Sequence, residues 1–173
     1  MLPTILSDKG QKAKAKVEAI SRMLLTGEVN LDDVMEAARG AKGSERGTCI
    51  EAIEFATKEK PEIATLNCLR FVSETLLDKA PRVRWESARV IANIAHLYPD
   101  KLDKAICNLL TNTEFPGTVV RWSAALALGE IIKLRTKLNK NLVSAIEPIL
   151  RREDDNAIKK IYQAALKHAA SGS

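Results

Sequence analysis

The chain has 173 residues, of which 46% are hydrophobic and 4% aromatic, and its 27 basic and 22 acidic residues leave a net charge of +5. That length supports one well-buried domain, taken as residues 1–173, and the small charge excess lacks the strong asymmetry of a dedicated nucleic-acid binder. No apolar run approaches the roughly 20 residues that span a bilayer, and no secretory signal precedes the fold, so we expect a cytoplasmic protein without a membrane partner.

Apolar spacing interrupted by helix-breaking residues predicts nine helices and no strand. They cover roughly residues 8–25, 31–39, 44–58, 61–77, 81–97, 99–112, 117–134, 138–152 and 155–169. Pro61, Pro81 and Pro99 each fall in the first turn of a predicted helix, where proline removes no hydrogen bond. Gly27 and Gly40 fall where the end of a helix favours a left-handed residue. The short connections between helices predict antiparallel neighbours in an all-α fold.

Side chains that could carry chemistry are few and scattered. Cys49, Cys68 and Cys107 are odd in number and lie far apart in apolar helical pattern, so we expect three buried free thiols in a reducing compartment. His96 has no second ligand at metal-binding spacing, and the sequence contains no phosphate-binding loop or nucleophile motif. The sequence therefore predicts no catalytic residue, no metal site and no cofactor.

One short motif occurs twice in the middle of the chain. Val-Arg-Trp at positions 83–85 returns as Val-Arg-Trp at positions 120–122, and each copy opens an alanine-rich helical run. Self-similarity at this period is typical of stacked helix pairs, in which each pair covers the apolar face of its neighbour. The motif therefore predicts an extended array that binds a partner along its surface.

This pattern resembles the HEAT-repeat family, whose unit is a helix A, a short turn and a helix B that opens with Val-Arg. The better match begins at Val120 and continues through Gly129, and the second begins at Val83. The resemblance implies a right-handed α-solenoid of stacked antiparallel helix pairs. It divides the chain into an N-terminal cap helix at 8–25 and about four repeats, at 30–58, 61–97, 99–134 and 138–169.

The resemblance also implies a structural role for the repeated arginines. The family commonly places an aspartate six residues before the arginine, and the two form a ladder of hydrogen bonds between repeats. Asp78 stands six residues before Arg84, whereas Phe115 stands six before Arg121, which leaves the ladder unsupported there. Both arginines project near the middle of an apolar arc, so we expect paired, structural side chains rather than anion-binding ones. Gly129 costs about 1 kcal/mol inside a helix, and we expect close approach of the adjoining helix to offset that cost.

On a helical wheel, the helix at 81–97 has a polar face that includes Glu86, and the equivalent residues form the matching face of the helix at 117–134. In the resembling family, B helices line the concave side of the stack, so these two rows would be neighbours there. The two tryptophans either pack between repeats or act as exposed anchors, and both interpretations stay open. The candidate partner-binding residues are Trp85, Arg89, Asn93, His96, Trp122, Leu126, Glu130 and Lys133.

The leading hypothesis for function is a non-enzymatic scaffold that binds another protein or a peptide along the concave surface. The alternative is nucleic-acid binding through basic side chains, although Glu86 and Glu130 interrupt that track. Its candidate cations are Arg82, Arg89, Lys133, Arg135, Lys137, Lys159 and Lys160. A third hypothesis, a HEAT-like DNA glycosylase, is weaker because the strip holds no well-placed aspartate. The sequence does not determine the partner's identity or the oligomeric state.

Overall fold

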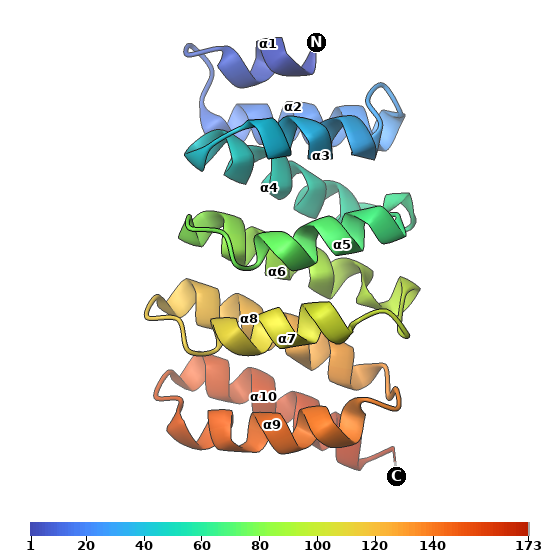
Figure 1. Cartoon of the computed structure of the whole chain (residues 1–173), viewed down its shortest axis with the longest axis vertical. Coiled ribbons are helices and arrows are strands. Elements are labelled where there is room, and N and C mark those ends of the chain that lie inside the picture. The colour runs from blue at the N-terminus through green and yellow to red at the C-terminus, as the bar shows by residue number, and fades with distance from the viewer. Residues whose placement is uncertain (173) are drawn as a thin grey trace.

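The computed structural model describes residues 1–172, and all regular structure in that range is helical. Its elements are α1 (Leu2–Ser7), α2 (Ala13–Thr26), α3 (Leu31–Gly40), α4 (Gly43–Glu59), the 3-10 helix η1 (Pro61–Ile63), α5 (Leu66–Thr75), α6 (Pro81–Ile94), the 3-10 helix η2 (Ala95–Leu97), α7 (Asp103–Asn112), α8 (Thr118–Lys133), α9 (Asn139–Arg152) and α10 (Asn156–Ala170). Consecutive α-helices form antiparallel pairs that stack in one column, with the termini at opposite ends (Figure 1). The predicted all-α solenoid of stacked helix pairs is confirmed.

The helices form two layers. The second helix of each pair, α2, α4, α6, α8 and α10, packs against the corresponding helix of the next pair, and these are the B helices. The first helices, α1, α3, α5, α7 and α9, are the A helices and form the other layer (Figure 1). A pocket of about 280 Å³ separates α7 from α9, and its lining includes Ile106, Leu110 and Leu142. The B layer is therefore the continuous spine of the stack.

Local sequence signals set several helix ends. Asn30, Thr65 and Asp155 each accept a hydrogen bond from a backbone N–H three residues later, at 2.8, 3.2 and 3.0 Å, and so cap α3, α5 and α10. Such caps satisfy N–H groups that have no partner inside the helix. Pro81 is the first residue of α6, and Gly27 ends α2 with a φ of 77°. The predicted positions of this proline and this glycine are confirmed.

The N-terminal helix predicted at 8–25 begins later than expected. The backbone N–H of Gly10 donates to the Asp8 carboxylate at 2.8 Å, and this turn separates α1 from α2. Leu2 and Leu6 of α1 are buried against the core. The predicted cap helix therefore has a short partner helix that the repeat pattern did not indicate.

Two other local predictions are wrong. Pro99 does not begin a helix, because the N–H of Lys101 donates to the Tyr98 carbonyl at 3.0 Å and this turn precedes α7. Gly40 is the last residue of α3 and is not left-handed. The left-handed residue is instead Gly43, the first residue of α4, with a φ of 52°. In both cases the breaker residue lies one turn or less from the bend that the chain makes.

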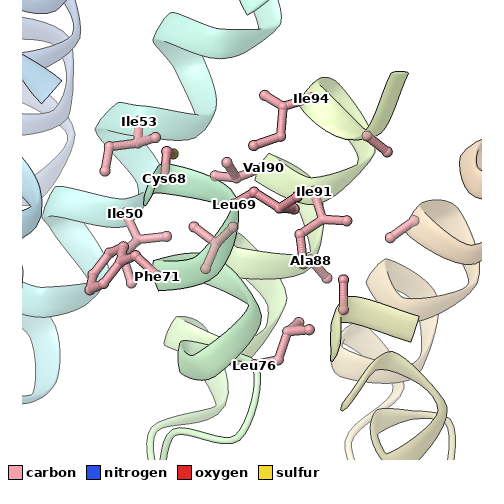
Figure 2. Packing of buried hydrophobic residues seen from close by; sticks show 14 of the residues in the cluster. Ile50, Ile53, Cys68, Leu69, Phe71, Leu76, Ala88, Val90, Ile91 and Ile94 are labelled. Atoms are coloured by element: carbon pink, nitrogen blue, oxygen red, sulfur yellow. The ribbon is translucent and has the colours of Figure 1, made fainter. Parts of the chain in front are cut away.

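Aliphatic side chains fill the space between the layers. Val83 and Val120, the first residues of the repeated motif, are buried. Figure 2 shows Ile50 of α4, Leu69 of α5 and Ile91 of α6 packed in one cluster. Each side chain of this kind contributes about 1.5–3 kcal/mol when it leaves water completely. The core therefore continues from one repeat to the next.

Arginines near the start of three B helices connect consecutive repeats. Each donates to a side chain at or just beyond the end of the next A helix along the stack. The pairs are Arg46 with Asp78 at 2.5 Å, Arg84 with Asn112 at 2.8 Å and Arg121 with Glu153 at 3.1 Å. Each arginine also donates to a backbone carbonyl in its own repeat. This arginine ladder fixes the spacing between neighbouring pairs through charge-assisted hydrogen bonds.

The ladder differs from the expected one in its acceptors. Arg84 donates from Nε to the backbone carbonyl of Asp78 at 2.6 Å, and not to its carboxylate. The carboxylate of Asp78 pairs with Arg46 of the preceding repeat and accepts a hydrogen bond from the N–H of Ala80 at 2.8 Å. Phe115 has its ring centroid 4.8 Å from the guanidinium of Arg84, which suits a cation–π contact. Asp78 and Phe115, each six positions before an arginine, thus give their backbone carbonyls to that arginine and their side chains to the arginine of the preceding repeat.

Glu153 is a buried carboxylate acceptor of the ladder, with 6% of its surface exposed. Burial acts to raise its pKa, but hydrogen bonds outweigh that effect and hold the pKa below the usual value. The donors are Arg121 at 3.1 Å and the backbone N–H groups of Asp155 and Asp154 at 3.0 and 3.2 Å. This rung is therefore an ionised pair at neutral pH.

Gly129 faces α10, as expected for a contact between B helices. A Cβ atom built at this position would lie 3.5 Å from Cβ of Ala165 and 3.6 Å from Cγ2 of Ile161. These are ordinary van der Waals distances, so the two helices leave space for a methyl group. The approach is less close than the glycine suggested.

Candidate partner-binding face

The eight candidate residues lie on two neighbouring B helices and the 3-10 helix that follows the first. Trp85, Arg89 and Asn93 of α6 are half-buried, and His96 in η2 is exposed. On α8, Trp122 and Lys133 are exposed, whereas Leu126 and Glu130 are half-buried. Because α6 packs directly against α8, the structure brings the two rows together. Their contacts, however, differ strongly from one row to the other.

The α6 row is tied to α4 through buried carboxylates. Trp85 donates from Nε1 to Oε1 of Glu86 at 2.8 Å. Arg89 places Nη2 3.3 Å from Oε1 of Glu54 and Nη1 3.6 Å from Oε2 of Glu86. Glu86, expected on the polar face, is only 3% exposed. The guanidinium of Arg89 therefore pairs with two buried carboxylates of the protein itself.

Asn93 also has a structural contact. Its Nδ2 donates to the carbonyl of Glu54 at 3.1 Å and to Oγ1 of Thr57 at 3.2 Å. These bonds join α6 to α4 and satisfy a backbone carbonyl beside the buried carboxylates. The Asn93 side chain thus helps to hold two repeats in register.

Glu86 has an unusual protonation equilibrium. Burial raises its pKa from 4.5 to about 7. The hydrogen bond from Trp85 and the charge of Arg89 oppose this rise, while the negative charges of Glu51 and Glu54 add to it. At neutral pH this carboxyl is therefore near half-protonation, although it sits in the middle of the B layer.

The α8 row presents apolar surface. Val119 is 53% exposed and Trp122 is 36% exposed, and the half-buried Leu126 follows one turn later. The three residues at i, i+3 and i+7 share one helix face and form what we term the α8 strip. Val119 is not among the residues predicted from the sequence, because the repeated motif begins one residue later. Beyond the strip on the same helix, Nζ of Lys133 forms an ion pair with Oε1 of Glu130 at 2.7 Å.

Several basic side chains of the predicted nucleic-acid track already have acidic partners. Arg82 pairs with Glu51 across α4 and α6. Arg89 pairs with two buried glutamates, and Lys133 pairs with Glu130. A phosphate would have to displace these carboxylates before it met the cations. Three of the seven candidate cations are thus paired with carboxylates within the protein.

The cysteines divide into two classes. Cys49 and Cys68 are buried free thiols, and burial raises their pKa values to about 11 and about 12. Cys107 is exposed, so the prediction of three buried thiols is wrong for this residue. It lines the pocket between α7 and α9. Helical apolar pattern alone does not reveal that the A helices leave a pocket at this point.

Two further classes of site are not found in the described part of the chain. Within residues 1–172, no group of three or more His, Cys, Asp or Glu side chains could hold a metal ion. Over the same range, no helix combines the length and the apolar character needed to cross a bilayer.

No protein-family model and no curated protein sequence matches this chain. Solved structures do match it. An engineered protein has a TM-score of 0.70 at 20% identity, covering 99% of this chain and 80% of its own. A designed armadillo repeat protein has a TM-score of 0.69 at 19% identity, covering 97% and 80%. Another, in complex with the peptide (KR)4, has a TM-score of 0.68 at 20% identity with the same coverage. At these identities the likeness shows the fold, an armadillo-like α-solenoid.

Proposed function

We propose that this chain is a non-enzymatic interaction module that binds a protein or peptide along the exposed face of its B helices. The α8 strip carries this proposal. Val119 and Trp122 leave apolar surface uncovered on a layer where most large apolar side chains are buried. Tryptophan is enriched among the residues that dominate binding energy at interfaces. The peptide bound to a designed armadillo repeat protein of the same fold supports a peptide as the ligand.

The two tryptophans differ in their contacts and their exposure. Trp85 is half-buried and its indole N–H is used by Glu86, so we assign it to support of the α6 row. Trp122 is exposed, and we assign it the role of anchor, with Leu126 beside it. Lys133 and Glu130 would then form the polar rim. The pairing of Arg82, Arg89 and Lys133 with carboxylates argues against the nucleic-acid alternative on this face.

Two further assignments accompany this proposal. We propose HEAT-like rather than armadillo-like units, because each unit has two helices where an armadillo unit has three. We also propose a reducing compartment such as the cytoplasm, because all three cysteines are free thiols and one of them is exposed.

The test is capture of a partner from the source cell with matched variants. The double variant Trp122→Ala and Leu126→Ala removes the two largest side chains of the α8 strip, and Leu77→Ala removes an exposed leucine (43%) outside the B helices. Loss of a central aromatic anchor costs about 2 kcal/mol or more, so recovery of the partner should fall at least about thirtyfold. The Leu77 variant should bind as wild type. Equal recovery by all three proteins, with unchanged melting curves, would disprove the proposal.

A further inference from the structure

A pocket of about 260 Å³ opens between α4 and α6, on the same layer as the α8 strip. Glu54, Phe55, Lys58 and Glu59 of α4 line it together with Arg89 of α6. Sites for drug-sized ligands occupy about 300–1,000 Å³, so this pocket suits the end of a single side chain. Its lining combines a buried carboxylate with an exposed aromatic ring.

Two oxygens of the buried carboxylates at this pocket have no hydrogen-bond donor. Glu54 is 2% exposed; its Oε1 faces Arg89, while its Oε2 has no hydrogen-bond partner among residues 1–172. Oε2 of Glu86 likewise receives no hydrogen bond, although Arg89 lies 3.6 Å away. The only other guanidinium of the group, that of Arg82, is paired with Glu51. Three carboxylates thus share two cations, and buried oxygens without donors cost free energy.

We propose that a lysine or arginine side chain of the bound partner enters this pocket and pairs with the carboxylate of Glu54, which lines it. The proposal rests on the proposed function and names the chemistry of the partner. An ammonium or guanidinium group supplies both the N–H donors and the positive charge that the carboxylates lack. Phe55, 44% exposed, offers a ring face for a cation–π contact. Lys58 and Glu59 carry opposite charges, so together they leave the net charge of the pocket lining unchanged.

A proton competes with this cation. The groups that face Glu86 are Trp85 and Arg89 of its own helix and Glu51 and Glu54 of α4. Since the pKa of Glu86 is about 7, the cluster gains a proton at lower pH and keeps its full negative charge at higher pH. A basic side chain should therefore bind more tightly at pH 8 than at pH 6.

The test uses a defined probe, the labelled peptide acetyl-(Gly-Arg)4-amide, measured by fluorescence polarisation at pH 8 and about 150 mM salt. The matched probe replaces arginine with citrulline, which has nearly the same shape and no charge. The Glu54→Gln variant should bind the arginine peptide at least about tenfold more weakly, since a hydrogen bond to a charged group contributes about 1.5–3 kcal/mol. Glu74→Gln, at an exposed glutamate of α5, removes the same charge and should bind as wild type.

Three outcomes would overturn the proposal: no binding by wild type, equal binding of the citrulline peptide, or equal loss in the two glutamine variants. If Glu54→Gln does not fold, Phe55→Ala takes its place in the comparison and should also bind the arginine peptide more weakly. This exposed ring can be truncated without opening the core. The probe contains no apolar side chain and does not need the α8 strip. A negative result here therefore leaves the partner-capture experiment with Trp122→Ala and Leu126→Ala free to succeed or fail separately.

Discussion

Replacing Glu86 with glutamine should stabilise the protein at alkaline pH and leave its stability unchanged at acidic pH. The folded protein raises the pKa of this carboxyl from 4.5 to about 7, because burial disfavours the charged form. Between these two pH values the folded state binds more protons than the unfolded state, so the free energy of unfolding falls as the pH rises. Above pH 7 the whole cost of a buried, ionised Glu86 is present.

The magnitude follows from the same pKa values. A rise from 4.5 to about 7 corresponds to roughly 3 kcal/mol, at about 1.4 kcal/mol for each pKa unit. Glutamine keeps an oxygen for the Trp85 indole N–H and a neutral group beside Arg89, so it mimics the protonated acid. The variant should therefore differ from wild type by less than about 1 kcal/mol at pH 5 and exceed it by up to about 3 kcal/mol at pH 8.

Urea unfolding followed by circular dichroism at several pH values between 5 and 8 measures this difference. Glu74→Gln is the control, because Glu74 is exposed and its replacement removes the same charge from the surface. The reasoning fails if the stability difference between Glu86→Gln and wild type is the same at pH 5 and pH 8. It also fails if Glu74→Gln produces the same pH dependence.

The remaining predictions concern contacts outside this cluster. Gly129→Ala should raise the free energy of unfolding by up to about 1 kcal/mol in thermal melts, since the space beside α10 admits a methyl group. A maleimide should modify only Cys107 in the folded protein, and mass spectrometry should find Cys49 and Cys68 modified only after unfolding. Arg121→Ala should cost about 3 kcal/mol in urea unfolding because it leaves a buried carboxylate without its cation, and a cost below 1 kcal/mol would contradict the arginine ladder.

The repeated motif predicts the fold because its information is local. Val83 and Val120 each lie in the first turn of a helix, and the short turns around them force the helices to alternate in direction. The acceptors of the arginine ladder are not local. Asn112 lies 28 residues after Arg84, so its role depends on how one pair sits on the next. Spacing within a single repeat does not contain that information.

The same reason explains why the sequence misplaced some of the candidate partner-binding residues. A helical wheel describes one helix at a time, and on that basis Glu86 belongs to a polar face. The structure places α4 over that position, which buries Glu86 and engages Arg89. On α8 the equivalent of Glu86 is Ser123, which is also buried, while Trp122 remains 36% exposed. Equivalent positions in the two repeats thus have similar burial but different partners, which only the stacked structure reveals.

The two proposed contacts together define a spacing in the partner. Packed helices lie about 8–10 Å apart, so α8 lies about 12–15 Å from a pocket midway between α4 and α6. An extended peptide rises about 3.3 Å per residue, which places its basic residue about four positions from its apolar anchor. Peptides with one arginine and one leucine separated by two, four or eight positions test this spacing by fluorescence polarisation. The four-residue spacing should bind most tightly, and that advantage should disappear in both Glu54→Gln and Trp122→Ala. Affinity that does not depend on the spacing would mean that one peptide does not occupy both sites.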